Sequence, residues 1–324
     1  MFCVLVTGAA GFLGSRITSS LAASGNVQKV FAVDLVIGNW DSVHGCTVTP
    51  LVLDFLSDEL ELPVGIDTLV HAAGEKSDSS RMEAVNHVGT ENLIRAASRA
   101  GIRRFVYLSS VGVYGAAPHS GLVKEHFPHT PRNIYEQSKD AGERSVRQLC
   151  PELGIEFIVL QPSNVLGLVP GRSWPLLGLM RSVLRGRFAW FGSGDSWVNY
   201  VSVQDVAAAV VFASLNAPAG STYIVNTPER LSLLIDWVCQ ELSCPVPGSR
   251  LPLWVGGVAA ALGDLMERVT GNGAPLNRAK LLEIVNTTRY DGTALSRETG
   301  FHYPVGLQEL VRTLAQEYRR AGLL

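Results

Sequence analysis

Charge is scarce in this sequence, and no part of it is strongly basic. Only 17% of the 324 residues are charged, the formal net charge is −2, and no run of Lys and Arg occurs. Proteins that bind nucleic acid concentrate positive charge on one face or segment, so we expect no nucleic-acid partner. The apolar content of 47% excludes a disordered chain and fits a well-packed globular protein.

Cysteine is also sparse, and its spacing does not suggest a metal site. The five cysteines are odd in number and scattered, at Cys3, Cys46, Cys150, Cys239 and Cys244. The last two have no His or Cys neighbours at the spacing of metal ligands. We therefore expect no metal, and reduced structural thiols that are typical of a cytoplasmic protein.

The sequence contains no apolar run long enough to cross a membrane. Its most hydrophobic late segment, residues 251–262, lies between Arg250 and Asp264 and is far shorter than the ~20 residues that span a bilayer. We expect a buried or substrate-facing helix there, with shallow membrane contact as the alternative and no stable membrane insertion. Because the first predicted strand follows Met1 closely, we also expect no signal peptide.

A glycine-rich turn stands near the start of the chain. An apolar run at residues 3–6 predicts a buried strand, and three glycines spaced three apart follow it, Gly8, Gly11 and Gly14. Residues 13–21 then show apolar side chains at helical spacing. Such glycines allow a sharp turn, let backbone N–H groups approach a pyrophosphate, and let the helix pack closely on the sheet. A tight turn without a ligand is the alternative.

A carboxylate stands where a dinucleotide-binding fold needs one. A second apolar run, residues 30–33, ends in Asp34, twenty residues after Gly14. In such a fold this acid accepts hydrogen bonds from the adenosine ribose. A carboxylate there repels a 2′-phosphate, so NAD is favoured over NADP. A solvated charge at a strand end is the alternative.

Two further strand ends suit a flat cofactor. An apolar strand at residues 48–53 precedes Asp54 and Phe55, an acid and an aromatic ring that can face an adenine. Another strand ends in the small residues 72–74, which let a cofactor lie against the backbone. His71 precedes them without a carboxylate nearby in the sequence, so we expect it to be structural.

Five predicted strands alternate with helical segments over the first hundred and ten residues. This alternation predicts an α/β fold with a Rossmann-type doubly wound parallel sheet. Residues 1–170 would form the NAD-binding domain, and residues 171–324 a smaller, mainly helical substrate lobe. The two would be interleaved, because we expect a strand near residues 199–203 to return to the main sheet.

Three residues in the middle of the chain suggest proton transfer. Ser110 ends the fifth predicted strand, and Tyr135 and Lys139 share one face of a helix that begins at Pro131 or Asn133. A free tyrosine has a pKa of about 10, and a lysine cation one turn away lowers that pKa, so the phenol can serve as a base. The serine hydroxyl can hydrogen-bond the substrate oxygen. A solvated helix face is the alternative.

With these residues in place, the sequence resembles the extended short-chain dehydrogenase/reductase superfamily, which includes sugar-nucleotide epimerases and 3β-hydroxysteroid dehydrogenases. The resemblance covers nearly the whole chain and is carried by residues 7–14, 71–74, 86–90, 109–115, 135–139 and 162–167. It implies that Ser110 is the catalytic serine and that Lys139 also binds the nicotinamide ribose. It further implies that the loop at Pro162 and Ser163 lies against the nicotinamide.

The residues and the resemblance together predict the members of the site. The catalytic residues are Ser110, Tyr135 and Lys139, and Asn86, in a helix predicted over residues 82–100, supports the cofactor. The predicted cofactor-binding residues are Gly8, Gly11, Phe12, Leu13, Gly14, Asp34, Asp54, Phe55, Ala72, Ala73, Gly74, Asn86, Ser109, Tyr135, Lys139, Pro162 and Ser163. The predicted substrate residues are Asn164 and Lys76.

Departures from the family pattern narrow the choice of subfamily. Dehydratases carry an Asp-Glu pair after the catalytic hydroxyl, whereas residues 111–112 are Val and Gly here, so dehydration is not expected. The position of an arginine for a nucleotide diphosphate holds Val198, and Asn199 and Ser202 replace the accompanying acid and histidine. Gln161 replaces a second arginine, before the family proline. A diphosphate site is therefore in doubt.

The C-terminal part is similar to the 3β-hydroxysteroid and sterol-carboxylate dehydrogenase branch. The similar segments are residues 251–254, 275–278, 288–291 and 299–304. That branch uses an apolar lobe for a greasy substrate; a lobe that is only a packed core is the alternative.

We therefore expect an NAD-dependent oxidoreductase that interconverts a secondary alcohol and a ketone on an apolar or sterol-like small molecule. A sugar-nucleotide epimerase or 4-ketoreductase is the first alternative. A non-catalytic dinucleotide-binding regulator is the second, although such proteins typically lack the tyrosine or lysine. The resemblance also suggests a homodimer packed through the helices that carry Asn86 and Tyr135.

Overall fold

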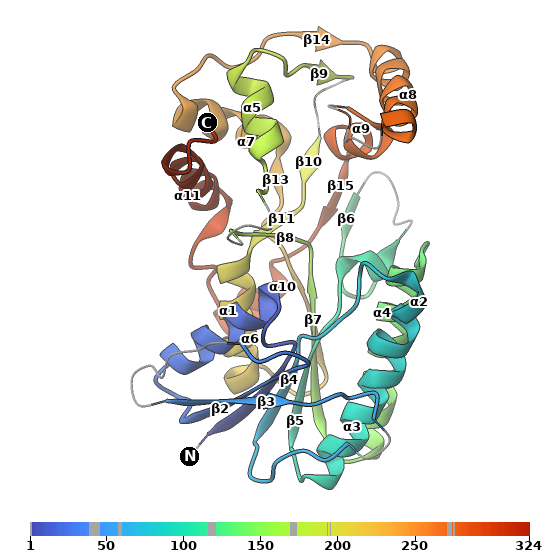
Figure 1. Ribbon diagram of the computed structural model, residues 1–324, viewed down its shortest axis with the longest axis vertical. Coiled ribbons are helices and arrows are strands. Elements are labelled where there is room, and N and C mark those ends of the chain that lie inside the picture. Colours follow the sequence, from blue (N-terminus) through green and yellow to red (C-terminus); the bar gives the residue numbers. More distant parts are fainter. Residues whose placement is uncertain are drawn as a thin grey trace.

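Seven parallel strands form the central sheet, in the order β12-β7-β5-β4-β1-β2-β3 (Figure 1). The computed structural model describes residues 2–38, 46–57, 60–115, 121–168, 174–192, 194, 196–270, 274 and 276–324. The strands of the sheet are β1 (Cys3–Thr7), β2 (Lys29–Asp34), β3 (Thr47–Val52), β4 (Thr68–His71), β5 (Arg104–Leu108), β7 (Glu156–Pro162) and β12 (Ser221–Val225). The strand order reverses beside β1, which makes the sheet doubly wound and confirms the predicted fold class.

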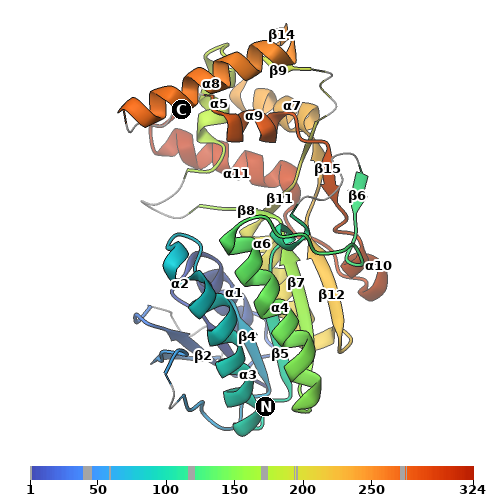
Figure 2. The same ribbon diagram turned by 90° about the vertical axis from the view of Figure 1, so that its right-hand side faces the viewer.

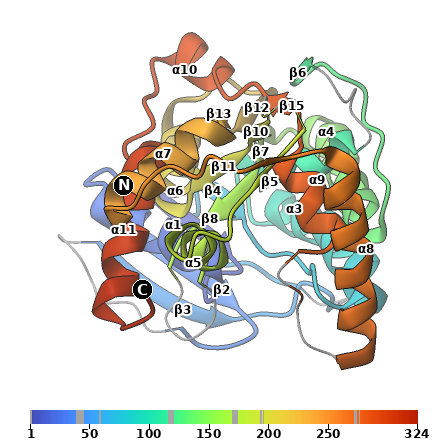
Figure 3. The same ribbon diagram turned by 90° about the horizontal axis from the view of Figure 1, so that it is seen from above.

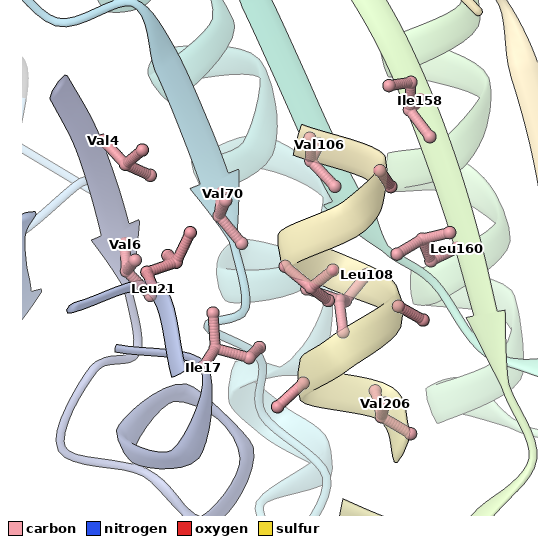
Figure 4. Close-up of a cluster of buried hydrophobic side chains, with 14 of the residues drawn as sticks. Val4, Val6, Ile17, Leu21, Val70, Val106, Leu108, Ile158, Leu160 and Val206 are labelled. Carbon is pink, nitrogen blue, oxygen red and sulfur yellow. The ribbon is translucent and has the colours of Figure 1, made fainter. Parts of the chain in front are cut away.

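Helices cover both faces of this sheet. On one face lie α1 (Phe12–Ala23) and α6 (Val203–Asn216), and Ile17, Leu21 and Val206 from these helices belong to one apolar cluster with the strand side chains (Figure 4). On the other face lie α3 (Gly89–Arg99) and α4 (Ile134–Glu152). Strands buried on both faces explain the nearly unbroken apolar runs at the inner strands of the sheet, whereas the edge strand β3 is largely accessible.

The predicted helix over residues 82–100 is divided into three parts. It runs as α2 (Ser79–Glu83), a π-helical turn η1 (Ala84–Val88) and α3. Single π turns inside helices are frequent at functional sites, and Asn86 lies within this one. A hydrophobic pattern does not distinguish a π turn from an α turn, so the sequence could not predict the break.

A second layer of short strands and helices forms the lobe above the carboxyl ends of the sheet strands (Figure 2). Its core joins α5 (Leu177–Leu184), α7 (Leu231–Leu242) and α11 (Gly306–Arg320), and α8 (Leu253–Thr270) and α9 (Arg278–Ile284) lie outside them. Its strand pairs are β8 (Asn164–Leu166) with β11 (Tyr200–Ser202), β10 (Trp197–Val198) with β13 (Glu229–Arg230), β9 (Trp190–Phe191) with β14 (Arg250–Leu251), and β6 (Gly121–Val123) with β15 (Thr288–Tyr290). The predicted boundary at residue 170 lies outside the described residues.

The two parts are interleaved, but by a different strand from the expected one. The strand near residues 199–203 does not return to the main sheet, because β11 pairs with β8 in a separate two-stranded sheet. Instead β12 joins the sheet edge beside β7. Asp205 ties the lobe to α6, since its carboxylate accepts hydrogen bonds from the backbone N–H groups of Val305 and Gly306, which begins α11, at 2.8 and 2.9 Å. Helix α10 (Ala294–Thr299) also packs near β12.

The apolar segment at residues 251–262 begins as a strand and continues as α8, which extends to Thr270. Contrary to the expectation of a buried or substrate-facing helix, most of its large apolar side chains are exposed. Within the described ranges, no helix has the length and apolar character needed to cross a membrane.

Candidate active site

A single large cavity connects the glycine-rich turn to the lobe. Its volume is about 1970 Å³, and it opens over the carboxyl ends of the central strands, where α/β sheets bind ligands. Every residue predicted for the site lines this cavity except Asn86. The tertiary structure therefore brings together nearly all the positions that the sequence singled out across its first half.

The glycine-rich turn leaves no room for side chains. Gly8 has a φ of +69°, and a Cβ there would lie 2.7 Å from the backbone of Ala73. A Cβ at Gly14 would lie 2.0 Å from the carbonyl oxygen of Gly8. Gly11 caps α1 without a side chain, so no side chain occupies the first N–H groups of the helix, and residues 11–14 line the cavity. This cradle fits the pyrophosphate of a dinucleotide.

Asp34 braces the same turn from the end of β2. Its Oδ2 accepts from the backbone N–H of Ala10 at 2.9 Å, and its Oδ1 accepts from that of Leu35 at 2.7 Å. The carboxylate also lines the cavity. It retains lone pairs for further hydrogen bonds, because each carboxylate oxygen accepts more than one.

Asp54 and Phe55 form the far wall of the cavity. The Asp54 carboxylate accepts from the N–H of Leu56 at 2.9 Å, and the Phe55 ring meets His71 edge-on at 5.7 Å between centroids. Gly89 makes this position possible, because a Cβ there would lie 2.5 Å from the Phe55 ring. The aromatic wall is thus held by a contact with α3 that no local sequence pattern indicates.

His71 is a structural residue, as expected. Its ring is fully buried between Thr7, whose Oγ1 is 2.7 Å from Nδ1, and Thr90, whose Oγ1 is 3.1 Å from Nε2. Because Thr90 donates its own proton to the carbonyl of Asn86, Nε2 must donate to Thr90 and Nδ1 must accept from Thr7. Burial, together with a smaller effect of the charge of Lys139, lowers the pKa of His71 to about 3. The ring is therefore neutral.

Asn86 lies behind the residues that line the cavity and fixes the loop after Gly74. Its Oδ1 accepts from the N–H of Glu75 at 2.8 Å, and its Nδ2 donates to the carbonyl of Glu75 at 2.8 Å and to Ser138 at 2.9 Å. Ser138 in turn donates to the carbonyl of Tyr135. Asn86 therefore links the loop after Gly74 to the first turn of α4, and its side chain is fully occupied by protein partners.

Ser110, Tyr135 and Lys139 meet at one side of the cavity. Asn133 begins α4 as a side-chain cap, accepting from the N–H of Glu136 at 2.9 Å, so the helix presents the tyrosine and lysine together. Ser110 hydrogen-bonds Tyr135. The Lys139 Nζ donates to the carbonyl of Leu108 at 2.5 Å, at the end of β5.

Burial opposes charge at both groups. Burial raises the pKa of Tyr135, whereas its hydrogen bond with Ser110 lowers it by a smaller amount. This outcome differs from the sequence-based expectation that Lys139 lowers the tyrosine pKa. Burial also lowers the pKa of Lys139 to about 7, against a smaller raising effect of Glu143. The lysine ammonium is thus only partly formed near neutral pH.

A buried polar network beneath α4 was missed by sequence reasoning. Glu143 accepts from Gln161 at 3.0 Å and from Arg147 at 2.7 Å, and Tyr114 donates to Gln161 at 2.6 Å. Gln161 does not line the cavity; its side chain instead connects β7 to the catalytic helix. The spacing of these residues in the sequence does not indicate the network, because their contacts join three separate elements.

The other positions expected for a diphosphate also have mainly structural roles. Asn199 is buried and donates to the carbonyl of Thr288 at 2.9 Å, and Ser202 caps α6. Only Val198 of this group lines the cavity.

The lobe contributes an apolar wall and several cations. Its apolar lining residues include Leu176, Leu179, Phe188, Phe191, Leu231, Leu234, Leu251, Leu276 and Ile284. Arg181, Arg185, Arg187 and Lys280 line the same part. Leu251 and Leu276 lie in segments that the sequence assigned to an apolar lobe. The other residues were not predicted, because apolar and basic residues scattered over a hundred positions form no motif until the chain folds.

The described part of the chain contains no cluster of metal-ligating side chains. There, no three His, Cys, Asp or Glu residues lie close enough to hold an ion. The five cysteines are free thiols and none lines the cavity.

A family model described as NAD dependent epimerase/dehydratase family matches residues 4–226. The chain belongs to this family. NAD is its cofactor, and the resemblance to the extended short-chain dehydrogenase/reductase superfamily is confirmed.

Relatives with different substrates align over almost the full length. N-acetyl-alpha-D-glucosaminyl-diphospho-ditrans,octacis-undecaprenol 4-epimerase from Escherichia coli O157:H7 is 26% identical over 98% of this chain and 96% of its own. Sterol demethylase protein B from Methylococcus capsulatus is 29% identical over 99% of each chain. The solved structure of UDP-glucose 4-epimerase from Thermotoga maritima has a TM-score of 0.71 at 20% identity, covering 99% of each chain, and supports the fold.

Proposed function

We propose that the protein interconverts a secondary alcohol and a ketone, with NAD, on a substrate that has a large apolar part. The cavity carries this proposal, because it joins Ser110, Tyr135 and Lys139 directly to the apolar walls of the lobe. Both a sterol and a lipid-linked sugar, the substrates named in two relatives, combine a secondary alcohol with an extended apolar body.

Tyr135 acts as the acid/base in this proposal. It takes the proton of the substrate hydroxyl in the oxidative direction and returns it in the reductive one, while NAD supplies the hydride acceptor or donor. Because burial raises its pKa, the phenolate needs support from Ser110 and from the ammonium of Lys139. Ser110 also orients the substrate oxygen, since its hydroxyl faces the same cavity.

The glycine cradle and its neighbours would hold the cofactor. Gly8, Gly11 and Gly14, with Phe12 and Leu13, would surround the pyrophosphate, and Asp34 would bind the adenosine ribose and favour NAD over NADP. The remaining walls would be supplied by Asp54, Phe55, Ala72, Ala73, Gly74, Ser109, Pro162 and Ser163, which all line the cavity. The side chain of Ser109 supports this placement, because its buried hydroxyl has no protein partner.

A second candidate function is epimerisation of a sugar carried on a lipid diphosphate. The arginines of the lobe favour it, because Arg181, Arg185 and Arg187 line the cavity and guanidinium groups match phosphate oxygens. They offer a different diphosphate site from the family position now held by Val198. In either reaction, Asn164 and Lys76 would contact the substrate, since both line the cavity that Ser110, Tyr135 and Lys139 also line.

One experiment separates these candidates. The purified protein is incubated with NAD and, separately, with a hydroxysterol, a polyprenyl-diphosphate sugar and a UDP-sugar, while NADH absorbance and sugar stereochemistry are followed. A dehydrogenase accumulates NADH, whereas an epimerase changes the sugar without net NADH. If only the UDP-sugar reacts, the proposal of an apolar substrate is wrong. If NAD binds but no substrate of any class turns over, the regulator hypothesis gains support.

Two further expectations remain proposals. A homodimer packed through α3 and α4 is supported by exposed apolar residues at the starts of these helices, Val88 and Ile134. A cytoplasmic location is supported by the five free thiols, which persist in a reducing compartment. Analytical ultracentrifugation of the wild type and of Ile134→Glu tests the dimer.

A further inference from the structure

Helix α8 exposes most of its large apolar side chains, whereas its buried side consists of small residues. Gly256, Ala260 and Gly263 form the buried side. A Cβ at Gly256 would lie 2.8 Å from the Phe191 ring, and one at Gly263 would lie 1.8 Å from the carbonyl oxygen of Leu276. The helix therefore packs on the lobe through close backbone approach, which leaves its bulky residues facing outward.

The outward residues form a continuous stripe, here called the α8 stripe. It consists of Trp254, Val258, Leu262, Leu265, Met266 and Val269, all exposed, with Trp254 exposed to 72% and Val269 to 77%. Positions 254, 258, 262, 265 and 269 repeat at helical spacing along four turns, so they share one face. A contiguous apolar surface of this kind marks an interaction site in a folded protein.

Charge around the stripe is positive. The two acids of α8 are turned to the lobe, where Asp264 accepts from the N–H of Arg278 and Glu267 from that of Ala274. Arg268 is exposed on the same helix. Arg185, Arg187 and Arg250 are exposed beside the β9–β14 pair, which packs under α8. No Asp or Glu occurs in residues 174–194 or 244–263.

The stripe lies at the end of the molecule opposite to the central sheet. Figures 1 and 2 place α8 at the outer end of the lobe, and Figure 3 shows it along the lobe's edge. Phe191, Leu251 and Leu276, which lie under or beside α8, also line the cavity. The exposed apolar face and the apolar end of the cavity are thus neighbours.

We propose that α8 docks the protein onto an anionic lipid bilayer, with the helix axis in the plane of the interface. Interfacial helices combine an apolar face carrying Trp and Leu with nearby cations that attract anionic headgroups. A second copy of this chain is a poorer occupant, because face-to-face packing would bring the exposed arginines of the two copies together. The inference goes beyond the proposed function and does not depend on which substrate is correct.

Vesicle flotation with the full chain tests this proposal. Vesicles of phosphatidylcholine mixed with phosphatidylglycerol should carry the wild type upward, more strongly than phosphatidylcholine alone and less strongly at high salt. The double variant Trp254→Glu/Leu262→Glu should bind these vesicles at least about tenfold more weakly, since each removed apolar contact and each added negative charge opposes interfacial binding.

Val64→Glu is the matched control. Val64 is exposed to 82% and precedes β4, so it lies at the amino end of a sheet strand, whereas the lobe lies above the carboxyl ends. This variant should therefore float like the wild type. Thermal melting of each variant, together with NAD binding, verifies that it folds. Absence of wild-type flotation, or equal flotation of the double variant, overturns the proposal. A further outcome also overturns it: the wild type binds no vesicles and is a dimer, and the double variant is a monomer. In that case a second copy of the chain covers the α8 stripe.

Discussion

The two ends of the cavity are formed by different kinds of contact. At the cofactor end, polar side chains such as Asn86 and Asp34 are tied to backbone groups, and glycines bring backbone against backbone. At the lobe end, the lining is mostly apolar side chains with exposed arginines among them. The first arrangement suits a cofactor held in one geometry, and the second suits selection of a substrate by shape and charge. Substitutions at the first end should therefore impair binding and chemistry, and those at the second should mainly change substrate affinity.

Tyr135→Phe should produce the largest effect. Loss of the phenol removes the proposed acid/base, and turnover should fall by at least about 100-fold. NAD affinity should remain near that of the wild type, because the ring is kept. Single-turnover kinetics and NAD titration measure the two quantities, and an unchanged rate would rule out the proposed role of this tyrosine.

The pH dependence of folding should reveal the buried lysine. The folded pKa of Lys139 is about 7 against 10.5 when unfolded, so between these values the unfolded chain binds more protons and stability rises with pH. Lys139→Met should remove this effect. Relative to the wild type, the variant should gain on the order of a few kcal/mol at pH 7, and this gain should shrink toward pH 10.

Urea unfolding of both proteins across this pH range, without cofactor, provides the measurement. A difference that stays constant from pH 7 to pH 10 would show that Lys139 is charged in the folded protein throughout.

Gly14→Val should disrupt the cofactor cradle. The new side chain would collide with the Gly8 carbonyl, which already lies 2.0 Å from the position of a Cβ. We expect NAD affinity to fall by more than about tenfold, together with the loss of stability typical of overpacking. Gly257→Ala is the control, because no atom lies within 4 Å of its Cβ position. Calorimetric titration with NAD distinguishes them; equal affinities would contradict the cradle.

Asp34→Asn should weaken discrimination between cofactors. The wild type should bind NADH more tightly than NADPH, and loss of the carboxylate charge should reduce NADH affinity by about tenfold, the effect of a charged hydrogen bond. Fluorescence titration with both cofactors measures the change. A wild type that prefers NADPH would refute the assigned role of Asp34.

The smallest effect should come from the lobe wall. Leu179 lines the cavity from α5, and Leu179→Ala should raise KM for an apolar substrate severalfold, roughly 3- to 10-fold, with little change in kcat. Leu184 lies on the same helix but outside the cavity, so the control variant Leu184→Ala should leave KM unchanged. If Leu179→Ala instead lowers kcat without changing KM, the proposed difference between the two ends of the cavity is wrong.

Local motifs explain why much of the site could be predicted. The glycine turn, Asp34 and the Tyr135–Lys139 pair were each predicted from short spacings along the chain, and such spacings are visible in a sequence. Gln161 was different. The sequence shows that Gln161 replaces a family arginine. It does not show the hydrogen bonds of Gln161 with Glu143 and Tyr114, because these join separate elements. The raised pKa of Tyr135 was missed for a related reason, because burial depends on packing that spacing does not record.

By itself, the sequence determined the parallel α/β fold, the glycine-rich turn proposed to bind NAD and the identity of the proposed catalytic residues. Buried strands, glycine spacing and helical periodicity are local consequences of backbone geometry. Only the tertiary structure decided which strand completes the sheet, which cations line the lobe and which face of α8 meets solvent. Those outcomes depend on long-range packing. In α8 the small residues Gly256, Ala260 and Gly263 are drawn inward by close contact, and this contact turns the bulky apolar residues outward.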